Sequence, residues 1–89
     1  MITVYKYELP VMDESSVWLP AGAEVLKICE VYSKVQLWAK VDTDQPQELR
    51  KFYIHGTGHP IYVENLKHID TFIMQGGALV FHVFEEASE

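Results

Sequence analysis

The chain has 89 residues and a formal net charge of −6, and hydrophobic residues make up 48% of it. This composition supports a packed core, argues against disorder and fits one domain over residues 1–89. The negative charge disfavours binding of long DNA or RNA through their phosphates. Cys29 is the single cysteine, which excludes an internal disulfide and favours a reducing cytoplasm. No apolar run approaches the ~18 residues of a membrane span, and Met1–Lys6 does not resemble a signal peptide.

The first half of the chain has a hydrophobic period of two, which predicts β-strands. Residues 3–9 and 17–19 form the first two expected strands, each ended by a proline. Residues 24–32 and 35–42 follow as a hairpin with a two-residue link. Apolar residues alternate with polar ones along 35–42, so one face of this strand is expected to be buried. The apolar positions are Val35, Leu37, Ala39 and Val41.

The second half begins with a polar loop at 43–48, which precedes an expected strand at 49–55. One helical turn is expected near residues 62–67. Residues 69–74 and 78–85 read as a terminal hairpin, and Leu79–Phe84 is apolar on both faces, which is typical of a central strand. We therefore predict an all-β fold of about seven short strands, as either a small twisted barrel or a sandwich.

A loop rich in glycine and histidine follows the fifth expected strand, where residues 54–60 read Ile-His-Gly-Thr-Gly-His-Pro. Glycine permits positive φ, so we expect a surface turn with at least one glycine in that conformation. Loops of this kind often carry binding groups, and backbone amides in a turn can meet an anion. We expect this loop to contribute His55, Gly56, Thr57, Gly58 and His59 to a binding site.

The polar faces of the fourth and fifth expected strands complete that predicted site. A hairpin closed by residues 43–48 would place Lys40 opposite Lys51, Trp38 opposite Tyr53 and Gln36 opposite His55. Two opposed lysines repel each other unless an anion or carboxylate lies between them. The aromatic pair would offer a flat stacking surface for a base, or an anchor for a protein partner. Alternatively, this face packs under the Pro10–Pro20 segment, with Trp18 or Met12 against Trp38.

Catalysis and metal binding find little support in the sequence. Four histidines would suffice for zinc or nickel if they converged, but His55 and His59 span a glycine loop rather than a helix. No nucleophile elbow, Walker-type loop or other catalytic motif is present. We therefore expect neither enzyme activity, nor a cofactor, nor a metal, and we interpret His82 as a core histidine bonded to a backbone carbonyl.

Three segments in order carry a family resemblance: Trp38–Asp44, Ile54–Pro60 and Gly76–Phe84. With Val4–Tyr7 and Leu19–Ala23, the resemblance spans nearly the whole chain. The sequence resembles a family of small bacteriophage and prophage proteins known only as a domain of unknown function. The resemblance implies expression in the cytoplasm of an infected bacterium, and many phage accessory proteins of this size act against host defences.

The function predicted from the sequence is therefore binding. We expect a phage accessory protein that counters a bacterial defence, by contact with a host protein or by capture of a small anionic nucleotide. A minor structural or assembly role in the phage, or a small histidine- or metal-dependent hydrolase, is the alternative. A homo-oligomer is expected because a chain this small buries a limited share of its surface.

Overall fold

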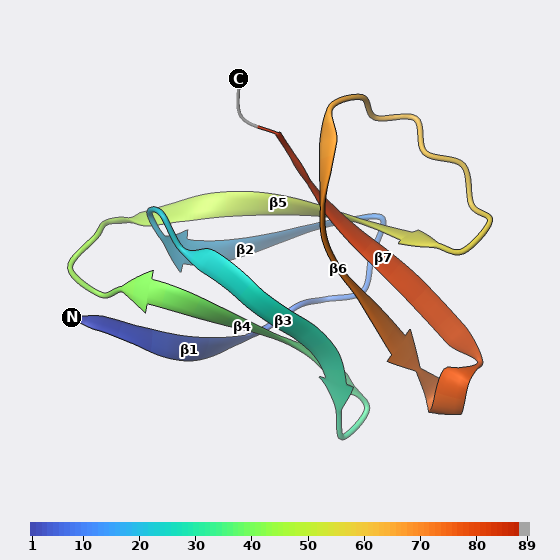
Figure 1. Cartoon of the computed structure of the whole chain (residues 1–89), viewed down its shortest axis with the longest axis horizontal. Helices are drawn as coiled ribbons and strands as arrows, with labels where there is room; N and C mark the ends of the chain where they lie inside the picture. Colours follow the sequence, from blue (N-terminus) through green and yellow to red (C-terminus); the bar gives the residue numbers. More distant parts are fainter. Residues whose placement is uncertain (88–89) are drawn as a thin grey trace.

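Seven strands and one short 3₁₀ turn make up the computed structural model, which describes residues 1–87 (Figure 1). The predicted all-β class is confirmed. The elements are β1 (Ile2–Glu8), β2 (Glu14–Pro20), β3 (Glu24–Val31), β4 (Lys34–Asp42), β5 (Gln47–Gly56), β6 (Leu66–Met74), η1 (Gln75–Gly77) and β7 (Leu79–Glu86).

The helical turn expected near residues 62–67 is wrong. These residues form the end of a loop and the start of β6, and Asn65 has φ of +59°. A residue in the left-handed region interrupts a right-handed helix, which explains the difference. The 3₁₀ turn lies instead in the connection from β6 to β7.

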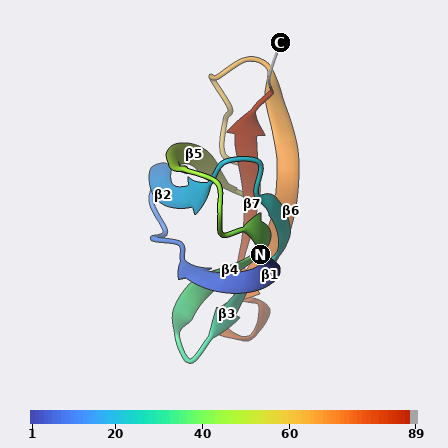
Figure 2. The same ribbon diagram turned by 90° about the vertical axis from the view of Figure 1, so that its left-hand side faces the viewer.

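The strands form two antiparallel sheets, with the orders β1-β4-β3 and β2-β5-β7-β6. In both views β1 and β4 lie on one side of the molecule, and β2 and β5 lie on the other (Figures 1 and 2). The central position predicted for residues 79–84 is confirmed, because β7 lies between β5 and β6.

The core lies between the facing sides of these two sheets, which makes the fold a sandwich. The four apolar positions of the alternating strand are all buried, as predicted. They pack in one cluster with side chains of the four-stranded sheet. The latter are Val17, Leu19, Phe52, Ile54, Phe72 and Val83.

The predicted pairing of β4 with β5 is wrong. Both edges of β4 are occupied, by β1 and β3, and β5 pairs with β2 and β7. Residues 43–46 therefore carry the chain from one sheet to the other rather than closing a hairpin. The tight turn before β4, where Tyr32 and Ser33 both have positive φ, commits β4 to β3. No helix of residues 1–87 is long and apolar enough to cross a membrane.

Candidate functional site

Trp38 and Lys40 lie on the outer side of the three-stranded sheet. Trp38 is in register with Lys6 on β1 and with Lys27 on β3. Directly opposed residues of neighbouring strands share a face, and residues two apart on one strand do so too. The partly exposed Trp38 is therefore flanked by a lysine on each side, with Lys40 next along its own strand. We call these four residues, Lys6, Lys27, Trp38 and Lys40, the Trp38 face.

The charge of the Trp38 face is opposite to that of the whole chain. Lys6, Lys27 and Lys40 are exposed, and none of them forms an ion pair with any residue of 1–87. Lys34, Arg50 and Lys51 do have acidic partners, for example Lys34 with Glu8 at 3.8 Å, whereas the exposed Lys67 has none among residues 1–87. Lysines therefore occupy three positions next to Trp38 in a protein of net charge −6.

Lys51, Tyr53 and His55 lie on the outer side of the other sheet, with the core between them and the Trp38 face. Lys51 forms an ion pair with Glu14 at 3.8 Å. Tyr53 is only 6% exposed, and its hydroxyl donates to Glu86 at 3.0 Å. The prediction that these residues form one site with Trp38 and Lys40 is therefore wrong. Its cause is the mistaken pairing of β4 with β5.

The glycine loop at the end of β5 forms the predicted surface turn, and Gly58 has φ of +85°. Two of its amides already have backbone acceptors: Thr57 donates to Val80 at 3.3 Å, and His59 donates to Gly56 at 3.0 Å. The ring of His59 lies against Gly56, where an added Cβ would come within 2.9 Å of it. The loop thus belongs to the sheet that does not carry Trp38, and these amides bond within the loop and to β7.

Two histidines, His68 and His82, belong to a hydrogen-bonded chain that begins at Thr57 of this loop. His82 contacts two hydroxyls, those of Thr57 at 2.8 Å and Thr71 at 3.1 Å. Thr71 in turn contacts His68 at 2.9 Å, so the groups form one hydrogen-bonded chain. The predicted bond of His82 to a carbonyl is therefore wrong, because hydroxyls of neighbouring segments reach both ring nitrogens. Among residues 1–87, no three metal-binding side chains converge on one point.

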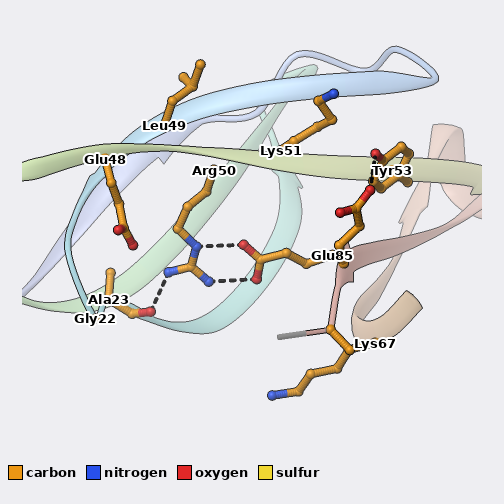
Figure 3. Close-up of a pocket in the computed structure, with 11 residues that line it drawn as sticks. Gly22, Ala23, Glu48, Leu49, Arg50, Lys51, Tyr53, Lys67 and Glu85 are labelled. Carbon is orange, nitrogen blue, oxygen red and sulfur yellow. Dashed lines mark hydrogen bonds and ion pairs between the residues drawn. The ribbon is translucent and has the colours of Figure 1, made fainter. Parts of the chain in front are cut away.

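An open hollow of about 750 Å³ lies beside β5, between the turn that precedes β3 and the end of β7 (Figure 3). Arg50 crosses it, with Nε and Nη2 bonded to both carboxylate oxygens of Glu85 at 2.6 and 2.7 Å. Its Nη1 donates to the carbonyl of Ala23. The hydrogen bond with Glu85 raises the pKa of Arg50, so this guanidinium stays charged. Arg50 thus links β5 to β7 and to the turn before β3 across this hollow, which Lys51 and Lys67 also line.

Sequence reasoning missed Lys6 and Lys27 of the Trp38 face and the Arg50–Glu85 pair. The position of Arg50 could have been recognised from the sequence. It follows the same alternation as Phe52 and Ile54, so its side chain points to the same side of β5 as these buried residues. A charged residue on that side needs a partner. No sequence pattern indicated that Lys6 and Lys27 lie beside Trp38, since only the strand order brings them there.

Comparison with curated proteins and with solved structures found no match. The phage origin implied by the sequence resemblance stays a prediction. The model of one family matches residues 1–89, and the chain therefore belongs to that family, which is described as a domain of unknown function (DUF7352).

Proposed function

We propose that this protein is a non-catalytic binding protein and that its Trp38 face binds a compact anion carrying an aromatic ring, such as a nucleotide. The observation that carries the proposal is the row Lys6–Trp38–Lys27 across three strands, with Lys40 alongside. Stacking of a base on an aromatic side chain contributes about 1–3 kcal/mol, and any base provides the necessary π-face.

The charge distribution favours a short anion over a long one. The three lysines of the Trp38 face attract phosphate locally, while the net charge of −6 repels an extended polyanion that crosses the rest of the surface. On the three-stranded sheet, Glu8 and Asp42 lie at the two ends of the surface and Glu24 lies opposite Lys40. The cationic area is therefore confined by acidic residues, which favours a compact anion.

Calorimetric titration with AMP, ADP-ribose and cyclic di-AMP tests this proposal. Trp38→Ala should weaken binding about tenfold or more, which corresponds to ~1.4 kcal/mol. Lys6→Ala with Lys27→Ala should weaken it further and reduce its salt dependence. Trp18→Ala is the matched control, because Trp18 is the other tryptophan, 60% exposed on the other sheet. Loss of binding in Trp18→Ala alone, or no heat with any of the three ligands, would contradict the proposal.

The biological role that fits such binding is capture of a signalling nucleotide in the cytoplasm of an infected bacterium. The support for the phage context is the sequence resemblance alone. Blockade of a host defence protein, or a minor role in phage assembly, would use the same exposed face without a nucleotide. Native mass spectrometry of the protein purified from infected cells separates these roles, since it reports a retained nucleotide, a host protein or other phage proteins.

The histidine chain supports one second candidate, a hydrolase that acts on a phosphodiester. Imidazoles held in place by hydroxyls, as His82 is by Thr57 and Thr71, can act as general acids or bases. Phosphorus NMR of the three ligands incubated with the protein tests this directly. Turnover that is lost in His82→Asn would favour the hydrolase, whereas unchanged spectra would favour binding alone.

A further inference from the structure

β1 has one paired edge and one open edge, because it is the outer strand of the sheet β1-β4-β3. A backbone hydrogen bond lies at each end of its pairing with β4. The N–H of Thr43 donates to the carbonyl of Met1 at 2.8 Å, and the N–H of Leu9 donates to the carbonyl of Val35 at 2.9 Å. Backbone groups in an antiparallel pair point alternately toward and away from the partner strand. The odd-numbered residues of β1 therefore bond to β4, and the even-numbered ones point their N–H and C=O groups outward. These outward residues are Ile2, Val4, Lys6 and Glu8.

The other outer strands are each less open than β1. β3 and β6 cover each other, and the carboxylate of Asp70 accepts the N–H of Ile28 at 2.7 Å. β2 ends in Pro20, which has no N–H to donate. β1 pairs with β4 without a bulge over its whole length and contains no proline. Ile2 is 62% exposed, Val4 50% and Tyr5 45%. An open edge of this kind is a template for another strand.

We propose that a second copy of this chain pairs with β1 in antiparallel fashion, about a two-fold axis at Tyr5. This register places Val4 opposite Lys6 of the second copy and Ile2 opposite its Glu8. Every outward-pointing residue of β1 then meets an outward-pointing residue, whereas any shifted register leaves some of these groups unpaired. The two Tyr5 rings meet at the axis, and aromatic cross-strand pairs of this kind stabilise a sheet.

The pairing makes one six-stranded sheet with both Trp38 faces on the same side. The two β4 strands are then three strand spacings apart, about 14 Å. The two Lys6 side chains come together at the centre, between the two tryptophans. Their mutual repulsion is relieved by an anion, so ligand binding and dimerisation should favour each other. The surface fits a phosphate-linked pair of bases, such as a dinucleotide; this assignment of the ligand rests on the proposed function, and the dimer does not.

Sedimentation of the full chain over a range of micromolar concentrations tests the dimer. A single strand per copy is a small contact compared with the ~1,200–2,000 Å² of a standard interface, so we expect a micromolar dimer of twice 10.3 kDa. Val4→Pro removes an outward N–H and leaves the bonds to β4 intact, so it should give a folded monomer with the wild-type circular dichroism spectrum. Val4→Thr keeps the N–H and should remain a dimer. A monomer boundary for the wild type, or a dimer broken by Ser16→Pro on β2 and not by Val4→Pro, would overturn the proposal.

Calorimetry of the same variants tests the shared ligand surface. Cyclic di-AMP should bind the wild type with one molecule per two chains, and Val4→Pro should weaken this binding at least tenfold while AMP binding changes less than threefold. A dimer without heat from either nucleotide would contradict the proposed function and leave the dimer standing. A monomer that binds AMP would contradict the dimer and leave the proposed function standing. One cyclic di-AMP per chain would contradict the shared surface.

Discussion

Asp70 on β6 accepts a hydrogen bond from the backbone N–H of Ile28 on β3, with 2.7 Å between oxygen and nitrogen. Both residues lie close to irregularities in their own ladders, at Val25/Lys27 in β3 and at His68/Asp70 in β6. Bulges bend a strand and leave backbone groups unpaired. The carboxylate of Asp70 therefore links β3 of one sheet to β6 of the other, close to the irregular points of both ladders.

Replacing Asp70 should destabilise the whole domain. Asp70→Ala removes the acceptor of Ile28 and also that of the Thr71 amide, which bonds to the other carboxylate oxygen at 2.8 Å. We expect a loss of about 1–3 kcal/mol in the free energy of unfolding, measured with urea. The exposed Glu64→Ala is the control and should change this free energy by less than about 0.5 kcal/mol. Equal effects of the two substitutions would show that the junction contributes nothing.

The Arg50–Glu85 pair should stabilise the folded protein through its geometry as well as its charge. Arg50→Ala leaves a partly buried carboxylate and the carbonyl of Ala23 without their donors, and should cost about 2–4 kcal/mol of stability. Arg50→Lys keeps the charge but not the two-pronged contact, so it should recover only part of this loss. A double-mutant cycle with Glu85→Ala measures the coupling, and additive losses would contradict a direct interaction.

Tyr53 should ionise later than an ordinary tyrosine. The hydrogen bond to Glu86, with a smaller effect of burial, raises the pKa of Tyr53 above the usual 10.0. The stabilisation from this bond is therefore complete below pH 10 and is lost as the pH rises through the pKa of the folded state. Ultraviolet titration of the phenolate should show a late step that moves to lower pH in Glu86→Gln. Burial also raises the pKa of Tyr7, so Tyr7→Phe is needed to separate the two late steps.

The two glycines of the loop should respond differently to alanine. Gly58 has φ of +85°, which is unfavourable for any residue with a Cβ, so Gly58→Ala should cost about 1 kcal/mol. Gly56→Ala places a methyl group against the ring of His59, which is exposed and can move aside. Its cost should be smaller and should disappear in the His59→Ala background. If Gly56→Ala costs as much stability in the His59→Ala background as in the wild type, or more, then the backbone and not the ring sets the constraint.

The alternation of residue types made the fold class and the core predictable. Val35 and Leu37 are buried while Gln36 and Trp38 are not, because a period of two tells which side of a strand faces the core. The same argument found the central strand β7, which is apolar on both faces. Helical structure was harder, since the left-handed residue Asn65 gives no strong signal in sequence.

The candidate site was only half predictable, because periodicity does not tell which strands are neighbours. Trp38 and Lys40 belong together on any model of β4, since they are two residues apart on one strand. Lys51 and Tyr53 were assigned to the same site because β4 was predicted to form a hairpin with β5, but β4 pairs with β1 and β3 instead. Lys6 is 32 positions from Trp38 in the chain, and only the completed sheet brings them side by side.

The indole N–H signals of the two tryptophans give the most direct test of the central claim, that the Trp38 face binds a nucleotide. A ¹H–¹⁵N spectrum shows one such signal for Trp38 and one for Trp18, assigned with the Trp18→Phe variant. Addition of AMP should shift the Trp38 signal in a saturable manner, together with the amides of Lys6 and Lys27, and leave the Trp18 signal in place. A saturable shift at Trp18 with none at Trp38, or no saturable shift at either ring, would contradict the account.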